Sequence, residues 1–440
     1  MVKMVRSWDE DFETFLRGLG KRGELGGPEV KEKVQRILQE LKNGGREALL
    51  FWARKLDKFP EDRDSLELHP DEWEKAISQL PPRYMEAMER ASVRIRKFHE
   101  ATIPKSWLTL DSEGCILGHL VRPLERVGIY APGGKAAYPS SVLMTAIPAK
   151  VAGVEELVMC SPMSPLDPNP AVLAAAKLAG VDRVFAIGGV QAIGAMAYGI
   201  GEVPKVDKIV GPGNVFVAEA KRAVFGEVDI DMFAGPSEVL IVADGSAPAS
   251  FAAWDMLSQA EHDEMASAIL VTPSEPYALE VERELEVHLR GAKRRGIAEE
   301  SLRRYGAIIV CRNMEEALEI ASRVAPEHLE LLMERPMEIL SKVRNAGAVF
   351  LGMWSTEPFG DYVAGPSHVL PTGGTARFAS PLGVEDFLKR TSVIGLDREG
   401  VLELGGDVIS LAELEKLEAH ARAVRVRLDS PAKRGRMEKK

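Results

Sequence analysis

Two stretches of the chain combine side chains that suit metal binding or acid–base chemistry. Gln259 and His262 stand three residues apart at the end of an alanine-rich helical stretch, so both side chains would lie on one helix face. An imidazole nitrogen and an amide oxygen can chelate a divalent metal together, but the spacing is not that of a zinc-protease helix. From the local sequence alone, a hydrogen-bonded helix end is the simpler interpretation.

The second stretch holds Glu327 and His328, a carboxylate beside an imidazole near a predicted helix. Histidine titrates near neutral pH and suits general acid–base catalysis. Adjacent helical residues do not face each other, so a charged surface turn is the simpler interpretation, although the pair could reach two parts of one substrate. Asp361 and His368 add a carboxylate and an imidazole in an irregular, glycine- and proline-rich stretch after Gly352, and such stretches often carry function.

Three strand-to-helix turns are rich in glycine. The turn at residues 211–214, Gly-Pro-Gly-Asn, has the context of a dinucleotide fingerprint, but Phe216 stands where the third glycine belongs. Residues 188–189 and 129–134 form two similar turns. Each alone is equally consistent with a tight turn. Three of them in one parallel series favour a nucleotide crevice at the carboxyl ends of the strands.

Three further residues have simple local interpretations. His420 follows Glu415 in a densely charged final helix, which predicts a solvent-facing side chain. Cys160 ends a predicted strand and could be a nucleophile, but no histidine is near it in sequence. A buried strand cysteine usually behaves as a small hydrophobic residue.

The elements that position these residues change character along the chain. The first 100 residues are predicted to be helical, with one helix starting at Gly27-Pro28, and strand-like runs follow at 107–110 and 115–130. Strand-like runs then alternate with helical stretches, which is typical of βαβ units and parallel sheets. The predicted strands form two series, 157–160, 184–187, 208–210 and 228–230, then 239–242, 268–271, 307–310 and 348–351. An α/β protein with two doubly wound modules is therefore expected, with a final helix from Leu411 to about Val424.

Composition excludes several classes of protein. Of 440 residues, 45% are apolar and 28% charged, which argues against wholesale disorder. The net charge of −10 argues against nucleic acid as the main partner. No run reaches the ~18 apolar residues of a membrane span, and Asp9, Glu10 and Asp11 stand where a signal peptide would be apolar. A cytoplasmic protein is expected, and three scattered cysteines do not form a disulfide framework.

Seven longer blocks resemble the histidinol dehydrogenase family and span roughly residues 30 to 425. In chain order they are ERVGIYAPGGKAAYPSSVLMTAIPAKVAGV from Glu125, IGGVQAIGAMAYG from Ile187, VGPGNVFVAEAKR from Val210, DMFAGPSEVLIVAD from Asp231, SQAEHD from Ser258, APEHLEL from Ala325 and GDYVAGPSHVLPTGGTARF from Gly360. Several of these blocks are long and unusual, so they are far more specific than any single motif above.

The resemblance implies oxidation of L-histidinol through L-histidinal to L-histidine, with two NAD molecules and one zinc ion per site. It implies that His328 is the general base and that Glu327 activates water for the second oxidation. The zinc ligands that it implies are Gln259, His262, Asp361 and His420. The further substrate contacts that it implies are Ser237, His368 and Glu415, beside His328 and the zinc ligands. Tyr130, Gln191 and Asn214 match the family's NAD contacts.

The resemblance also implies an intertwined homodimer in which the segment bearing Glu415 and His420 completes the partner's site. We predict two incomplete Rossmann-like modules, residues 130–237 for NAD binding and residues 26–129 with 238–381 for most metal and catalytic residues. The predicted flanking segments are residues 1–25 (helical), 382–429 (reaching the partner) and 430–440 (a basic, disordered tail).

Other functions differ in testable ways. A dehydrogenase of the same fold could oxidise another small alcohol, such as a sulfonated diol, and substrate profiling would separate the two. A metal-dependent hydrolase would turn over without a nucleotide and would leave the glycine turns unexplained. In a non-catalytic protein, His328→Ala would change nothing beyond stability.

Overall fold

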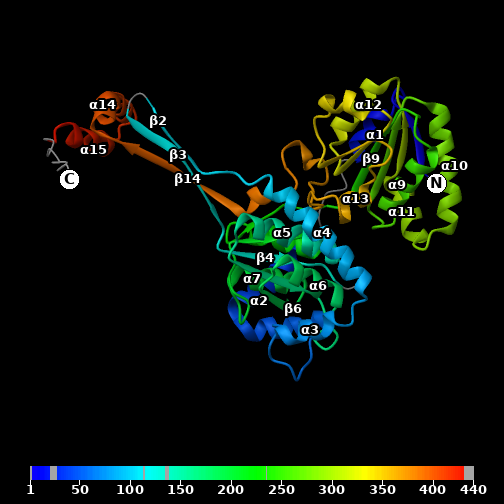
Figure 1. Ribbon diagram of the computed structural model, residues 1–440, viewed down its shortest axis with the longest axis horizontal. Coiled ribbons are helices and arrows are strands. Elements are labelled where there is room, and N and C mark those ends of the chain that lie inside the picture. Colours follow the sequence, from blue (N-terminus) through cyan, green and yellow to red (C-terminus); the bar gives the residue numbers. More distant parts are fainter. Residues whose placement is uncertain (1, 20–26, 112–113, 134–137, 234, 431–440) are drawn as a thin grey trace. The chain divides into compact units, whose positions relative to one another are not determined.

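The computed structural model describes residues 2–19, 27–111, 114–133, 138–233 and 235–430. The chain divides into two compact units, Met1–Ile103 with Leu124–Phe387, and Pro104–Pro123 with Leu388–Lys440. The larger unit contains two parallel sheets, and the smaller unit contains one antiparallel sheet (Figure 1). Among the described residues, no helix combines the length and the apolar character needed to cross a membrane.

A five-stranded parallel sheet in the order β6-β5-β4-β7-β8 forms one half of the larger unit. Its strands are β4 (Arg126–Tyr130), β5 (Glu156–Ser161), β6 (Arg183–Ala186), β7 (Lys208–Val210) and β8 (Asp229–Ile230). The chain moves outward from β4 to β6 and then returns to β7 on the other side of β4. The switch point of this sheet, where open α/β sheets bind ligands at the carboxyl ends of the strands, therefore lies between β4 and β7.

Helices cover both faces of this sheet (Figure 1), because alternate strand residues point to opposite sides. Leu157 and Met159 pack toward one group of helices, and Val158 and Cys160 pack toward the other. The first group is α3 (Pro70–Ile77), α4 (Pro82–Glu100), α5 (Pro139–Ala152) and α6 (Pro170–Ala179). The second is α2 (Pro28–Trp52), α7 (Gly189–Tyr198) and α8 (Val215–Val224).

A six-stranded parallel sheet in the order β1-β11-β10-β9-β12-β13 forms the other half. Its strands are β1 (Lys3–Arg6), β9 (Glu238–Ala243), β10 (Ser267–Thr272), β11 (Ala307–Val310), β12 (His328–Leu332) and β13 (Ala348–Leu351). One face packs against α9 (Ala249–Ala260), α10 (Glu275–Gly291) and α11 (Arg295–Tyr305), and the other against α1 (Phe12–Leu19) and α12 (Met314–Val324). The switch point of this sheet lies between β9 and β12.

Short elements connect the two halves of the larger unit. After β13 the chain forms α13 (Glu357–Tyr362), and single turns follow at η5 (Thr375–Arg377) and η6 (Val384–Phe387). Elsewhere in the larger unit, η2 (Ala53–Asp57) is a single π-helical turn, and η3 (Pro336–Glu338) and η4 (Leu340–Lys342) are single 3₁₀ turns. The smaller unit contains the antiparallel strands β2 (Trp107–Leu110), β3 (Cys115–Pro123) and β14 (Leu388–Leu396), followed by α14 (Arg398–Leu414) and α15 (Glu418–Leu428).

The α/β class and the parallel sheets are confirmed, but several predicted elements are wrong. The strand-like run at 115–130 is two strands, β3 and β4, which belong to different sheets. The helix predicted to start at Gly27-Pro28 is α2, although the Asn-Gly-Gly run at 43–45 favours an end there; α2 continues through a kink at Gly45, which takes φ +54°. The final helix is two helices, separated at Lys416, which has φ +60°.

The N-terminal part also differs from the prediction. The sequence predicts a helical segment over residues 3–6, yet they form strand β1, which pairs with β11 and so extends the six-stranded sheet. Helices α2, α3 and α4 pack on the five-stranded sheet, whereas the predicted division grouped residues 26–129 with 238–381. The other domain boundaries stay predictions. Gly134, residues 20–25 and the basic tail from residue 431 lie outside the described residues.

Candidate active site

One cavity of about 380 Å³ gathers most of the predicted site residues of the larger unit. The five-stranded sheet contributes the turns that follow the carboxyl ends of its switch strands, β4 and β7. The six-stranded sheet contributes the amino ends of β9 and β12. Predicted site residues that line the cavity are Asn214, Ser237, His262, Glu327, His328, Asp361 and His368.

Two buried glutamates, Glu238 and Glu327, form reciprocal hydrogen bonds between the amino ends of β9 and β12. The Glu238 backbone N–H donates to Glu327 Oε2 (2.9 Å), and the Glu327 backbone N–H donates to Glu238 Oε2 (3.3 Å). Glu238 Oε1 also accepts from the Gly373 backbone N–H (3.0 Å). The Glu327 carboxylate is therefore fixed at the cavity wall by the strand that neighbours its own.

The proton of the His328 ring has a definite position. Nδ1 lies 2.9 Å from the backbone carbonyl oxygen of Glu238. Because a carbonyl oxygen can only accept, Nδ1 carries the hydrogen and Nε2 has a free lone pair. Nε2 lies 3.9 Å from Asp361 Oδ1. Burial lowers the pKa of His328 to about 4, although the Asp361 charge opposes this shift, so the ring is neutral at pH 7 and can accept a proton at Nε2.

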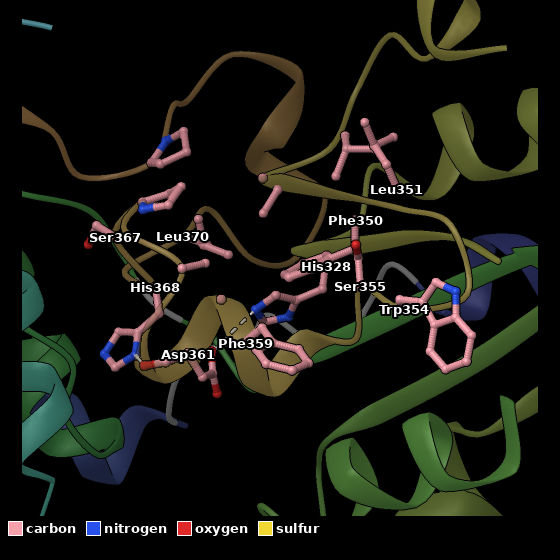
Figure 2. A pocket seen from close by; sticks show the side chains of 17 residues that line it. His328, Phe350, Leu351, Trp354, Ser355, Phe359, Asp361, Ser367, His368 and Leu370 are labelled. Atoms are coloured by element: carbon pink, nitrogen blue, oxygen red, sulfur yellow. Dashed lines mark hydrogen bonds and ion pairs between the residues drawn. The ribbon is translucent and has the colours of Figure 1, made fainter. Parts of the chain in front are cut away.

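His368 is held between the two halves of the larger unit. Its Nδ1 donates to the Asp361 backbone oxygen (2.9 Å), and its Nε2 lies 3.2 Å from the Ser141 hydroxyl on α5. Burial lowers the pKa of His368, which keeps this ring neutral as well. Figure 2 shows His328, Asp361 and His368 beside an adjoining cavity of about 500 Å³, whose further lining includes Phe350 and Trp354.

Helices α9 and α13 bring together groups that could hold a metal ion. Ligand atoms of His262, Glu357 and Asp361 lie within 4.8 Å of one another. The Gln259 carboxamide points an atom at Glu357 that lies 3.2 Å from both carboxylate oxygens. Imidazole, carboxylate and amide groups form the nitrogen and oxygen donor set that suits an open zinc site.

The buried Glu357 also fits a cation at this position. Its side chain is 2% exposed, and burial raises the pKa of Glu357 well above its usual range, with Asp361 and Glu327 adding to the shift. A cation among these carboxylates would offset their mutual repulsion and lower the pKa of Glu357 again. Glu357 was not predicted from the sequence. The sequence signal for Glu357 is its four-residue spacing to Asp361, which puts both on one face of a helix. Pro358 and Gly360 obscured that signal because both residues are uncommon inside helices.

Glu415 and His420 belong to the smaller unit. Glu415 ends α14, His420 lies in the first turn of α15, and both side chains are exposed on that unit. Their expected role in a partner's site stays a prediction.

Of the three predicted NAD contacts, only Asn214 lines the cavity. Its side chain caps α8 by accepting from the backbone N–H groups of Phe216 (3.0 Å) and Val217 (3.2 Å). Tyr130 is 4% exposed and Gln191 is fully buried. The Tyr130 hydroxyl accepts from the Gly189 backbone N–H (3.2 Å), and burial raises the pKa of Tyr130 to about 12.

A buried ion pair between Lys221 and Asp231 shapes the glycine turn at the switch point. Lys221 donates to the Gly211 carbonyl oxygen (3.0 Å), and Asp231 accepts from the Gly211 backbone N–H (2.7 Å). Gly211 has φ +113°, and an added Cβ would lie 2.2 Å from the Tyr130 backbone oxygen. Only glycine therefore fits at this point of the crevice.

Comparison with known proteins assigns the chain to a family. A family model described as histidinol dehydrogenase matches residues 21–428. The chain belongs to the histidinol dehydrogenase family. The histidinol dehydrogenase of Syntrophotalea carbinolica is 50% identical over 428 residues, covering 97% of this chain and 99% of the relative. That of Aquifex aeolicus is 50% identical over 426 residues, covering 97% and 99%.

A solved structure supports the same assignment. The crystal structure of histidinol dehydrogenase from Elizabethkingia anophelis matches with a TM-score of 0.92 at 35% identity, covering 97% of this chain and 98% of that chain. The resemblance inferred from the sequence blocks is thus confirmed, and the chain is an NAD-dependent oxidoreductase of a histidine-biosynthesis family whose substrate is histidinol.

Proposed function

We propose that this enzyme oxidises L-histidinol through L-histidinal to L-histidine, reducing two NAD molecules, with zinc at the α9–α13 site. The observation that carries the proposal is one cavity lined by a neutral histidine base, a buried glutamate, candidate metal ligands and a glycine turn at a nucleotide-type switch point. A hydrolase would need no such turn.

His328 is the general base in both oxidations. Its free Nε2 accepts the hydroxyl proton as hydride leaves the substrate carbon for bound NAD. The Nδ1 hydrogen bond to the Glu238 carbonyl oxygen (2.9 Å) keeps the ring in the required tautomer and stabilises the charge gained on protonation. Asp361 Oδ1, at 3.9 Å from Nε2, adds a favourable charge for the protonated ring.

Glu327 acts in the second oxidation. Its carboxylate is oriented by the Glu238 backbone N–H and lines the same cavity as His328. In this position it can take a proton from water that adds to the aldehyde carbon. The aldehyde oxygen takes the proton that His328 gained in the first oxidation, so the hydrated aldehyde carries two hydroxyl groups and His328 is free to accept a proton in the second hydride transfer.

Gln259, His262 and Asp361 would hold zinc, together with His420 of the partner subunit. Bound zinc supplies a positively charged anchor for the imidazole and amino nitrogens of the substrate. Ser237, His368 and the partner subunit's Glu415 would complete substrate binding in a homodimer, and Tyr130, Gln191 and Asn214 would contact NAD. A cytoplasmic enzyme without nucleic-acid or membrane partners stays our expectation.

The test is NADH formation by the zinc-loaded protein with limiting L-histidinol. Oxidation of an alcohol to an acid is two hydride transfers, so about two NADH per histidinol is expected, and a chelator should abolish it. One NADH per substrate would remove the aldehyde step and the role of Glu327. Turnover of sulfonated diols but not histidinol, or hydrolysis without a nucleotide, would overturn the proposal.

A further inference from the structure

Glu357 is a buried carboxylate beside the proposed metal ligands, to which the proposed mechanism gives no role. Its backbone N–H donates to Glu330 Oε1 on β12 (2.8 Å). The preceding residue, Thr356, donates its hydroxyl to Asp255 Oδ1 on α9 (2.6 Å). The start of α13 is thus attached both to the centre of the six-stranded sheet and to α9, which fixes where the Glu357 side chain begins.

The same helix that anchors Thr356 presents Gln259 to Glu357. Asp255 and Gln259 are four residues apart on α9 and therefore lie on one face of it. Gln259 is fully buried, and its near amide atom lies 3.2 Å from both oxygens of Glu357. An ionised carboxylate only accepts hydrogen bonds, so beside a bound cation the amide nitrogen is the atom that belongs there.

A carboxamide can offer a metal only its oxygen, since its nitrogen has no available lone pair. An unrestrained glutamine can rotate either atom toward the ion. We propose that Glu357 is a positioning residue that binds the N–H group of Gln259 and so commits the amide oxygen to the metal. This inference rests on the proposed zinc site. Groups that orient metal ligands in this way typically change metal affinity by about 10–100-fold when removed.

The inference predicts different zinc affinities for two variants of the full-length chain. Glu357→Gln keeps an oxygen that accepts from the Gln259 N–H group, so zinc affinity should stay within about threefold of the wild type. Glu357→Ala removes the acceptor, so affinity should fall about 10–100-fold. The control is Glu338→Gln, an exposed carboxylate paired with Arg335 on the surface, which should leave affinity unchanged.

Zinc affinity is measured by competition with a chromophoric chelator, and the melting temperature of the metal-free protein reports folding. The decisive step repeats Glu357→Ala in a Gln259→Ala background. A residue that acts through Gln259 has no further effect there, whereas an independent ligand has its full effect.

The inference is overturned if Glu357→Gln loses as much zinc affinity as Glu357→Ala. It is also overturned if Glu357→Ala has its full effect on zinc affinity in the Gln259→Ala background. Either result would make Glu357 a zinc ligand. Unchanged affinity in Glu357→Ala would overturn it too. If Glu357→Ala does not fold, the Glu357→Gln affinity decides alone. Failure of the wild-type protein to bind zinc would instead overturn the proposed function.

Discussion

The buried ion pair between Lys221 and Asp231, beside the Gly211 turn, gives the sharpest test of how this fold is stabilised. The side chains of Lys221 and Asp231 are 3% and 1% exposed. Asp231 also accepts from the backbone N–H groups of Gly211 and Met232, both at 2.7 Å. Asp231→Asn keeps the size of the side chain but leaves the Lys221 ammonium group buried without a counter-charge. Removing one partner of a buried pair costs about 3–5 kcal/mol.

The free energy of unfolding in urea should therefore fall by about that amount in Asp231→Asn. Adding Lys221→Met removes the unpaired charge, so the double variant should be more stable than the single variant. Glu74→Gln, in the exposed pair with Lys177, is the control and should cost less than about 1 kcal/mol. Because the pair holds the Gly211 turn, Asp231→Asn should also raise the KM for NAD.

A loss below about 1 kcal/mol in Asp231→Asn would refute this reasoning, because it would mean that Lys221 reaches water or another acceptor. A double variant less stable than Asp231→Asn would refute it as well. That result would mean that the lysine contributes through packing rather than through its charge.

Three other perturbations have definite expected outcomes. His328→Asn should lower kcat about 10²–10⁴-fold with histidinol and with histidinal, whereas Glu327→Gln should spare the histidinol step more than the histidinal step; equal losses in both half-reactions would contradict these roles. His99 is buried, and burial lowers its pKa to about 4, so the unfolded chain binds more protons between pH 6.5 and 4. The free energy of unfolding should then fall by roughly 2.5 kcal/mol as the pH drops through this window. If the free energy of unfolding of His99→Leu, measured in urea, depends on pH as steeply as that of the wild type, burial of His99 is not the cause. Gly211→Ala should raise the KM for NAD and lower the melting temperature, because the new Cβ would lie 2.2 Å from the Tyr130 backbone oxygen; wild-type values for both would show that the turn adapts.

Buried parallel strands could be predicted from the sequence because both of their faces are covered. Such strands are continuous apolar runs, and the predicted runs 208–210 and 307–310 coincide with β7 and β11. Helix α6 has equally local signals in the sequence, since Asn169 caps it, Pro170 starts it and Gly180 ends it. These signals are local, so they survive without knowledge of the fold.

Strand β12 was missed because its sequence serves the site. It reads His-Leu-Glu-Leu-Leu, and all five residues are buried although two are ionisable. Polar residues in a central strand break the apolar run from which strands are recognised. His328 is tolerated because its Nδ1–H donates a hydrogen bond to the Glu238 backbone oxygen. Glu330 is tolerated because its side chain accepts a hydrogen bond from the Glu357 backbone N–H. Both partners are distant in sequence.

The sequence predicts only the part of the site at the carboxyl ends of the strands, and the topology explains why the other part was missed. The rule that ligands bind at the carboxyl ends of parallel strands fits the five-stranded sheet, where the turns that follow β4 and β7 line the cavity. In the six-stranded sheet the site lies at the opposite edge. Helix α9 crosses back between β9 and β10, so its C-terminal end places Gln259 and His262 beside the strand starts that carry Ser237 and His328.

The use of opposite edges suits the proposed chemistry. Hydride passes directly between two carbon atoms, so the proposed nucleotide crevice of one sheet has to open onto the proposed base and metal ligands of the other. Asn214 and His328 line the same cavity, which meets that requirement within the larger unit. A site at the carboxyl edge of β9 and β12 would instead have separated the ligands of α9 from the catalytic pair. The charged starts of β9 and β12 are therefore the positions where function overrides the sequence pattern of a buried strand.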